Sequence, residues 1–161
     1  MGIDTALYRQ VAGSFATGVT IITTGFEGSF HGMTASAFTS VSLDPNLILV
    51  CIDRTANTLP ILQACGWFNV NILSSGQEQL SRIFASKDAP ERDGLQGIAF
   101  SVGRTGVPRI DGTLAHLECR VTQQFDGGDH VIIMGEVQDG ALDAEAEPLL
   151  YFRGRYRRLG A

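Results

Sequence analysis

The sequence has 161 residues, of which 44% are hydrophobic and 18% charged. A chain of this length can bury one substantial core, so we expect a single domain over residues 1–161. The formal net charge of -5 argues against nucleic acid as a partner, because that binding needs a basic surface. The longest apolar runs are too short to cross a bilayer and the N-terminus lacks the pattern of a secretion leader. We therefore expect no membrane association and a cytoplasmic location.

Residues 4–18 predict an amphipathic helix. Asp4 can cap its first turn, Gly18 marks its end, and apolar side chains recur at helical spacing at Leu7, Val11 and Phe15. Residues 19–42 then predict a hairpin of two strands that turns at Glu27 and Gly28.

Two strands and two helices follow. The apolar run 46–52 ("NLILVCI") predicts a strand buried on both faces, and residues 67–73 predict another. A helix is expected over 55–66, and a second over 74–86 with Ser75 and Glu78 at capping-box spacing. From about Gly97 the pattern is β-like, with a turn at "DGGD". Taken together, these elements predict a mainly β fold with short helices, in which the strands form a closed or nearly closed barrel.

The three cysteines are odd in number and widely spaced. Cys51, Cys65 and Cys119 lie mostly among apolar neighbours, so we interpret them as small core residues and expect neither a disulfide framework nor a zinc site. The histidines and carboxylates likewise show no convincing metal-ligand spacing.

The stretch "GMTASAFTSVS", residues 32–42, combines small side chains with many hydroxyls. A strand that only filled a core would carry bulkier residues at alternate positions. Small side chains let a flat ligand with a polar edge approach backbone amides, while the hydroxyls supply further hydrogen bonds. The alternative is a polar edge strand whose hydroxyls face solvent.

Seven segments, in order, resemble the short-chain flavin reductases: "ATGVTIITT", "GMTASAFTSVSLDPNLILVCIDR", "FNVNIL", "FAS", "DGTLAHLECRV", "GDHVIIMGEV" and "LLYFRGRYR". Members of this family are reductase components of two-component flavin monooxygenases. The resemblance implies a split β-barrel of the FMN-binding flavin reductase type and a homodimer. It also implies FMN or FAD as the flavin, NADH or NADPH as hydride donor, and a partner oxygenase that receives reduced flavin.

The resemblance places the small, hydroxyl-rich stretch beside the flavin ring, whose polar edge needs hydrogen-bond partners once water is excluded. The candidate ring contacts are Thr34, Ala35, Ser36, Ser40, Val41 and Ser42.

A second candidate segment is "DRTANT", residues 53–58, at the start of the predicted helix. Arg54, the Thr55 hydroxyl and the N–H groups of a helix start can bind an anion, and the flavin phosphate fits there. Asp53 and Asn57 belong to the same segment. Alternatively, Thr55 or Asn57 caps the helix and Arg54 is solvated.

The segment "FAS" matches a family stretch near the ribityl-phosphate end of the flavin. The resemblance thus adds three candidate contacts, Phe84, Ala85 and Ser86. Without it, these residues are the end of an amphipathic helix with Phe84 in the core.

His130 begins the strand that returns after the "DGGD" turn, at an accessible position. It matches the histidine that the family places beside flavin and nicotinamide. Hydride transfer needs no protein nucleophile, so His130 is expected to orient the nicotinamide or supply a proton to the reduced ring. An ordinary structural histidine is the alternative.

The C-terminal "YFRGRYRR" interleaves basic and aromatic residues. As one strand it would place Tyr151, Arg153, Arg155 and Arg157 on one face. The family pattern puts Arg153 and Tyr156 beside the cofactor site, while a solvated dimer edge is the alternative.

Two functions remain open from the sequence. The first is an NAD(P)H-dependent flavin reductase, and the second is a flavin carrier or sensor of the same fold without nicotinamide turnover. The glycine-rich dinucleotide fingerprint does not occur, and the family binds its nucleotide without it.

Overall fold

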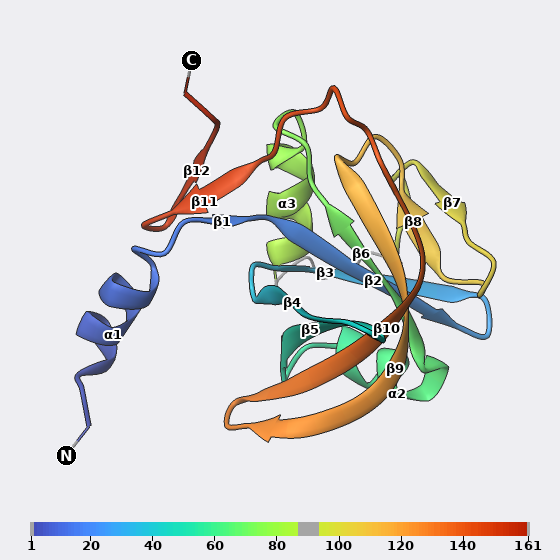
Figure 1. Ribbon diagram of the computed structural model, residues 1–161, viewed down its shortest axis with the longest axis horizontal. Helices are drawn as coiled ribbons and strands as arrows, with labels where there is room; N and C mark the ends of the chain where they lie inside the picture. The colour runs from blue at the N-terminus through green and yellow to red at the C-terminus, as the bar shows by residue number, and fades with distance from the viewer. Residues whose placement is uncertain (1, 87–93, 161) are drawn as a thin grey trace.

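The computed structural model describes residues 2–86 and 94–160. Within these ranges strands dominate, and the three helices are short: α1 (Thr5–Ala12), α2 (Thr58–Cys65) and α3 (Glu78–Ala85). The mainly β class is therefore confirmed (Figure 1). No helix in these ranges is long and apolar enough to span a bilayer.

The main sheet has seven antiparallel strands among the described residues. Their order is β3 (Ser29–Ala35), β2 (Thr20–Phe26), β6 (Trp67–Ile72), β9 (Ala115–Gly127), β10 (His130–Leu142), β5 (Asn46–Asp53) and β4 (Phe38–Leu43). The two edge strands, β3 and β4, are consecutive in the chain. The described strands nevertheless do not close into a barrel, because no ladder joins β3 to β4.

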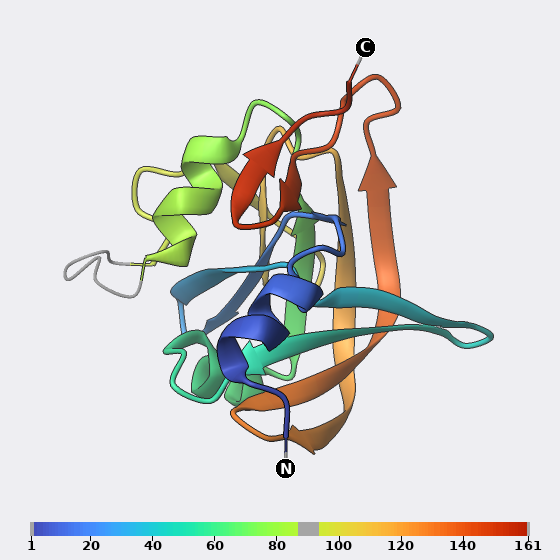
Figure 2. The ribbon, with the colours of Figure 1, turned by 90° about the vertical axis from the view of Figure 1, so that its left-hand side faces the viewer.

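Two smaller sheets flank the main one. A three-stranded sheet contains β1 (Thr17–Gly18), β11 (Leu150–Phe152) and β12 (Arg155–Arg157), and a two-stranded sheet contains β7 (Phe100–Val102) and β8 (Pro108–Ile110). Figure 2 shows the β4–β5 hairpin projecting from the body of the molecule.

The predicted hairpin is correct in its turn and wrong in its second arm. Glu27 and Gly28 both have positive φ, which suits a tight hairpin turn. The second arm breaks after Ala35, where the Phe38 N–H donates to Ser36 O at 3.0 Å. This turn carries the chain away from β2, and β4 pairs with β5 instead.

The apolar core lies on both faces of the sheet. Ile22 faces one cluster, which also contains Leu59 and Leu62 of α2. Its neighbour Ile21 faces a second cluster, which contains Phe84 of α3. This alternation follows from the period of two along β2.

Buried polar side chains attach β8 to the second face. The Thr23 hydroxyl donates to Pro108 O at 2.5 Å. The Asn71 amide donates to Ile21 O at 2.9 Å, and its carbonyl accepts from the Ile110 N–H at 2.8 Å. Because buried polar groups are costly unless paired, these bonds fix the β7–β8 hairpin on the sheet.

The N-terminal helix begins as predicted but ends at Ala12 rather than Gly18. Asp4 accepts a hydrogen bond from the Leu7 N–H at 3.1 Å, which confirms the N-cap. Gly13 disfavours further helical turns, and no packing compensates for it, since α1 has no buried residue. Its apolar residues Leu7 and Val11 are 50% and 60% exposed, and Phe15, beyond the end of the helix, is 79% exposed.

The predicted capping box of α3 is wrong. The helix begins at Glu78 with Gln77 as its N-cap, two residues later than Ser75, and Gln77 makes no capping bond with its side chain. In the preceding turn the Gln77 side-chain oxygen accepts from the Ser74 N–H at 3.0 Å.

The C-terminal segment is a tight hairpin and not a single strand. Arg153 and Gly154 both have positive φ, so the chain reverses between β11 and β12. Tyr151 consequently lies opposite Tyr156, with ring centroids 5.2 Å apart. The expected row of Tyr151, Arg153, Arg155 and Arg157 on one strand face is therefore wrong. We call β11–β12 the C-terminal ribbon.

Candidate functional site

A cavity of about 550 Å³ opens where five segments meet. Its wall contains β3 with the turn after it, the end of β5, the start of α2, the end of α3 and the start of β10. The volume is within the range of about 300–1000 Å³ that is typical of small-molecule sites. The cavity therefore brings together several segments that are distant in sequence.

One wall consists of small residues from β3 and its turn. Thr34, Ala35 and Ser36 line the cavity as the sequence predicted for a ligand surface. The Thr34 hydroxyl donates to Ser81 O of α3 at 2.7 Å, so it is held by the protein. The small side chains at 34–36 occupy little of the cavity, while His31 and Met33 of the same strand also line it.

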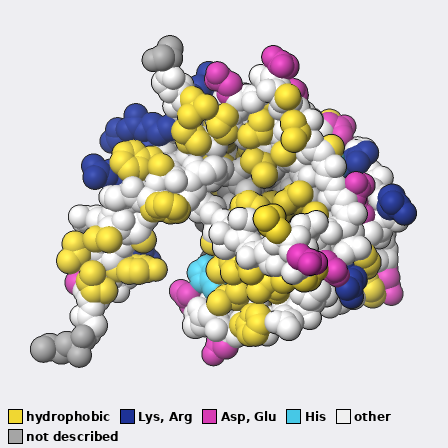
Figure 3. All heavy atoms as spheres, in the orientation of Figure 1, with side chains coloured by type: hydrophobic (Ala, Val, Ile, Leu, Met, Phe, Trp, Pro, Cys, Tyr) yellow, Lys and Arg dark blue, Asp and Glu magenta, His cyan; other side chains and the backbone are white. Residues whose placement is uncertain are grey.

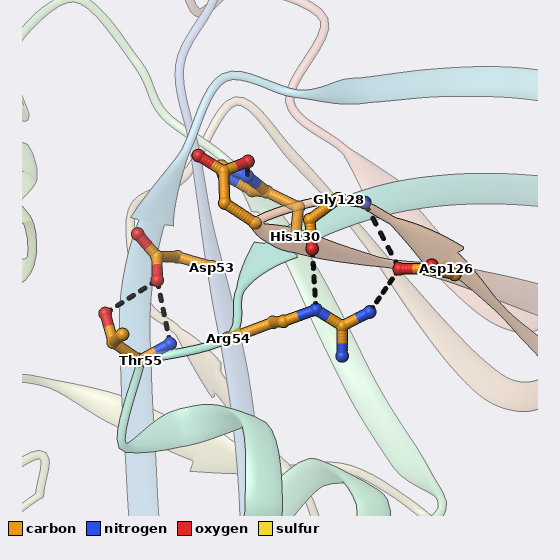
Figure 4. A network of polar contacts seen from close by, with 7 residues as sticks. Asp53, Arg54, Thr55, Asp126, Gly128 and His130 are labelled. Carbon is orange, nitrogen blue, oxygen red and sulfur yellow. Dashed lines mark hydrogen bonds and ion pairs between the residues drawn. The ribbon is translucent and has the colours of Figure 1, made fainter.

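Asp53 and Thr55 lie at the junction of β5 and α2 (Figure 4). The Asp53 carboxylate accepts from the Thr55 N–H at 2.8 Å and from its hydroxyl at 2.6 Å. Asn57 also lines the cavity and is the N-cap residue of α2, without a capping bond from its side chain. The start of α2 thus faces the cavity through Asn57 and Thr58.

Arg54 points away from this cavity (Figure 4). Its Nε donates to Gly128 O at 2.7 Å, and its Nη2 forms an ion pair with Asp126 at 2.5 Å. Arg54 lies in the turn after β5, where its own N–H donates to Asp129 O at 3.0 Å, so backbone and side chain are both bonded to the β9–β10 hairpin. Arg54 is thus bonded to the β9–β10 hairpin and is not part of the predicted anion site.

The end of α3 forms the opposite wall. Phe84, Ala85 and Ser86 line the cavity together with Ile83. Phe84 is only 8% exposed and belongs to the second core cluster as well. A methyl group on Gly32 would lie 2.8 Å from the Phe84 ring, so glycine at position 32 allows β3 and α3 to approach.

His130 is the first residue of β10 and lies directly opposite Asp53 of β5. Its Nδ1 is 2.7 Å from a carboxylate oxygen of Asp129, which orients the ring. The His130 side chain is 40% exposed and lines the cavity. It is therefore oriented and accessible, as a group that contacts a bound ligand must be.

Cys51 also lines the cavity, two residues before Asp53 on the same face of β5. Burial raises the pKa of its thiol above the ordinary value, so the thiol stays protonated near neutral pH. Cys119 is fully buried, and burial raises the pKa of its thiol to about 12. Cys65 is half-buried, and all three thiols are free.

Several predicted contacts lie outside the cavity lining. Ser40, Val41 and Ser42 belong to the edge strand β4, in the projecting hairpin. Arg153 lines a separate hollow beside α1, where its Nε donates to the Ser14 hydroxyl at 3.2 Å. The Tyr156 hydroxyl is 2.8 Å from the Ser81 hydroxyl.

Sequence reasoning missed other residues of the lining. Apart from His31, they are small or adjacent to predicted ones; the full set is His31, Gly32, Met33, Ala37, Cys51, Ala56, Thr58, Ile83 and Gly94. The period of two from Asp53 would have found Cys51. Among the described residues, no group of three or more His, Cys, Asp or Glu side chains is placed to bind a metal ion.

The chain belongs to the family described as "Flavin reductase like domain", whose model matches residues 12–160. This confirms the resemblance that the sequence motifs indicated.

Individual relatives cover nearly the whole chain. It is 40% identical over 157 residues to an NADH-dependent FAD reductase of Streptomyces globisporus, covering 96% of this chain and 86% of the relative. It is 38% identical over 152 residues to the reductase component of 4-hydroxyphenylacetate 3-monooxygenase from Thermus thermophilus, covering 94% and 95%.

A solved structure agrees with this family assignment. The Streptomyces globisporus NADH:FAD oxidoreductase in complex with NAD and FAD fragments superposes with a TM-score of 0.91 at 39% identity. The match covers 98% of this chain and 93% of that one. The similarity is therefore one of fold and sequence together.

Proposed function

We propose that this protein is a flavin reductase that reduces FMN or FAD with NADH or NADPH and supplies reduced flavin to a partner monooxygenase. The observation that carries the proposal is the cavity, which sets a wall of small residues at Thr34–Ser36 against the oriented imidazole of His130. Family membership and the printed activities of the relatives support the same reaction.

The cavity has features that fit a flavin. Small side chains on β3 accept a flat ring, and Gly32 lets the apolar ring of Phe84 approach that strand. Thr55, Asn57 and Ser86 line the same cavity, and their polar side chains fit a ribityl-phosphate chain. The described lining residues offer the phosphate the N–H groups at the start of α2 and the hydroxyl of Ser86.

The chain's own contribution to catalysis is to bind and orient. A flavin held in this cavity would supply the acceptor for a hydride from the reduced nicotinamide. The β3 wall and α3 hold the flavin ring, and Asp129 fixes the orientation of His130 through Nδ1. Nε2 of His130 is then the atom that contacts the nicotinamide or supplies a proton to the reduced ring.

We further propose that the fold is a split barrel and the functional unit a homodimer. The main sheet has consecutive strands as its two edges, which supports the first statement. Helix α1 supports the second, because it stands off the body with its apolar residues uncovered (Figure 3). A second copy of this chain would bury that face.

An activity assay tests the reaction. Purified protein is mixed under air with FMN or FAD and with NADH or NADPH, and nicotinamide absorbance is followed. We expect oxidation that requires both flavin and protein. Flavin binding without nicotinamide oxidation would contradict the reductase and leave the carrier or sensor.

A further inference from the structure

Helix α3 is held from two sides by hydrogen bonds that meet at Ser81. On one side, the Thr34 hydroxyl of β3 donates to the Ser81 carbonyl at 2.7 Å. On the other side, the Ser81 hydroxyl lies 2.8 Å from the Tyr156 hydroxyl of the C-terminal ribbon. Ser81 is fully buried, and its two partners, Thr34 and Tyr156, are half-buried.

Tyr156 contacts the next residue of α3 as well. The Arg82 guanidinium lies 4.7 Å from the centre of the Tyr156 ring, and it also pairs with Glu78 one helical turn earlier at 2.7 Å. The Tyr156 ring packs against the apolar cluster that contains Phe84. The ribbon therefore holds α3 at two successive residues, by a hydrogen bond and by ring packing.

The held residues directly precede the cavity wall. Residues 83–86 line the cavity, whereas Ser81, Arg82 and Tyr156 do not. One helical turn joins Ser81 to the lining residue Ala85, so any shift of α3 at Ser81 moves this wall relative to β3.

We propose that Tyr156 is a positioning residue for the flavin cavity, acting through Ser81 to set the distance between α3 and β3. The inference rests on the proposed function, since it assigns flavin to this cavity. It replaces the direct cofactor contact that the sequence suggested for Tyr156. The C-terminal ribbon, which lines no part of the cavity, thereby controls flavin affinity.

The test is the Tyr156→Phe variant, which removes the hydroxyl and keeps the ring. We expect its flavin Kd, measured by fluorescence titration without nicotinamide, to rise about 3- to 10-fold, as the loss of one hydrogen bond predicts. The flavin KM should rise in parallel, while kcat at saturating flavin should stay within about twofold, because the reacting groups are unchanged.

Tyr151→Phe is the matched control, because Tyr151 lies opposite Tyr156 on the same ribbon and is more exposed. This variant should bind flavin as the wild type does. Ser81→Ala should reproduce the higher Kd, and the double variant with Tyr156→Phe should be no weaker than either single one, because both remove the same bond.

Wild-type flavin affinity in both Tyr156→Phe and Ser81→Ala would overturn the proposal, as would additive losses in the double variant. Equal loss in Tyr151→Phe would also overturn it, since the effect would then belong to the ribbon as a whole. If Tyr156→Phe does not fold, Ser81→Ala decides alone. A wild-type protein that binds no flavin would instead contradict the proposed function.

Discussion

Arg54 and Asp126 form an ion pair at 2.5 Å, and this pair turns the Arg54 guanidinium away from the cavity that its neighbours Asp53 and Thr55 line. We therefore predict that Arg54→Ala leaves flavin affinity within about twofold of wild type. Titrations with FMN and riboflavin check this, because only FMN carries the phosphate. A loss confined to FMN would show that Arg54 binds the phosphate after all.

The same ion pair predicts a pH dependence of stability. The hydrogen bond from Arg54, together with the Gly128 N–H, lowers the pKa of the Asp126 carboxyl. A lowered pKa in the folded state stabilises the protein above the ordinary carboxyl pKa of about 4, and this contribution is lost as the pH falls through the lower, folded-state pKa. Urea unfolding should therefore separate Arg54→Ala from wild type at pH 7. The two should converge in strong acid, and a constant difference would contradict the assignment.

We predict that His130→Ala slows turnover while flavin still binds. Loss of an orienting or proton-donating imidazole should lower turnover by about 10- to 100-fold, because hydride transfer itself needs no protein nucleophile. Stopped-flow bleaching of flavin by NADH measures the rate, and a flavin titration on the same variant measures affinity. Bleaching at the wild-type rate would mean that His130 is a structural residue.

Gly32→Ala is predicted to damage both the core and the cavity. The added methyl would lie 2.8 Å from the Phe84 ring, which belongs to the second core cluster and to the cavity wall. Overpacking of this kind costs about 1–3 kcal/mol of unfolding free energy, and the displaced ring should weaken flavin binding. Urea denaturation and a flavin titration test the two effects. Gly76→Ala is the control, because no atom lies within 4 Å of its added methyl.

The exposed apolar face of α1 predicts that a charged substitution there dissociates the proposed homodimer. Val11→Glu places a charge among uncovered apolar side chains, so a dimer that buries them should dissociate. Light scattering should give twice the chain mass of 17.3 kDa for the wild type and the chain mass for the variant. Arg9→Gln, a polar change on the same helix, should stay dimeric. A wild-type mass of one chain would refute the dimer.

Local patterns predicted local structure well. The strand before Asp53 and the turn at Glu27 were identified because each depends on a few neighbouring residues. The prediction that this strand is buried on both faces was wrong, since Ile48, Val50 and Ile52 are buried and the residues between them only half-buried. The break between Ala35 and Phe38 was missed, since it depends on the pairing of β4 with β5, which composition does not reveal.

In the candidate site, too, residues recognisable from local sequence were predicted, and contacts between distant segments were not. The residues at 34–36 and 84–86 were found from small size, hydroxyls and family motifs, and they line one cavity. The direction of Arg54 could not be predicted, because it depends on bonds to Gly128 and Asp126 of the β9–β10 hairpin, which is distant in the chain. The contact of Tyr156 with Ser81 could not be predicted either, because it requires the chain reversal at Arg153 and Gly154 and the docking of that ribbon on α3.

The neutral thiol of Cys51 bears on how fast the protein is oxidised. In the proposed flavin site, reduced flavin that reacted with dioxygen would release hydrogen peroxide beside Cys51, which lines the cavity. Peroxide attacks the thiolate, and the raised pKa of the half-buried Cys51 keeps the thiolate fraction small. Partial burial of this side chain would thus slow oxidation of the protein at its own proposed site.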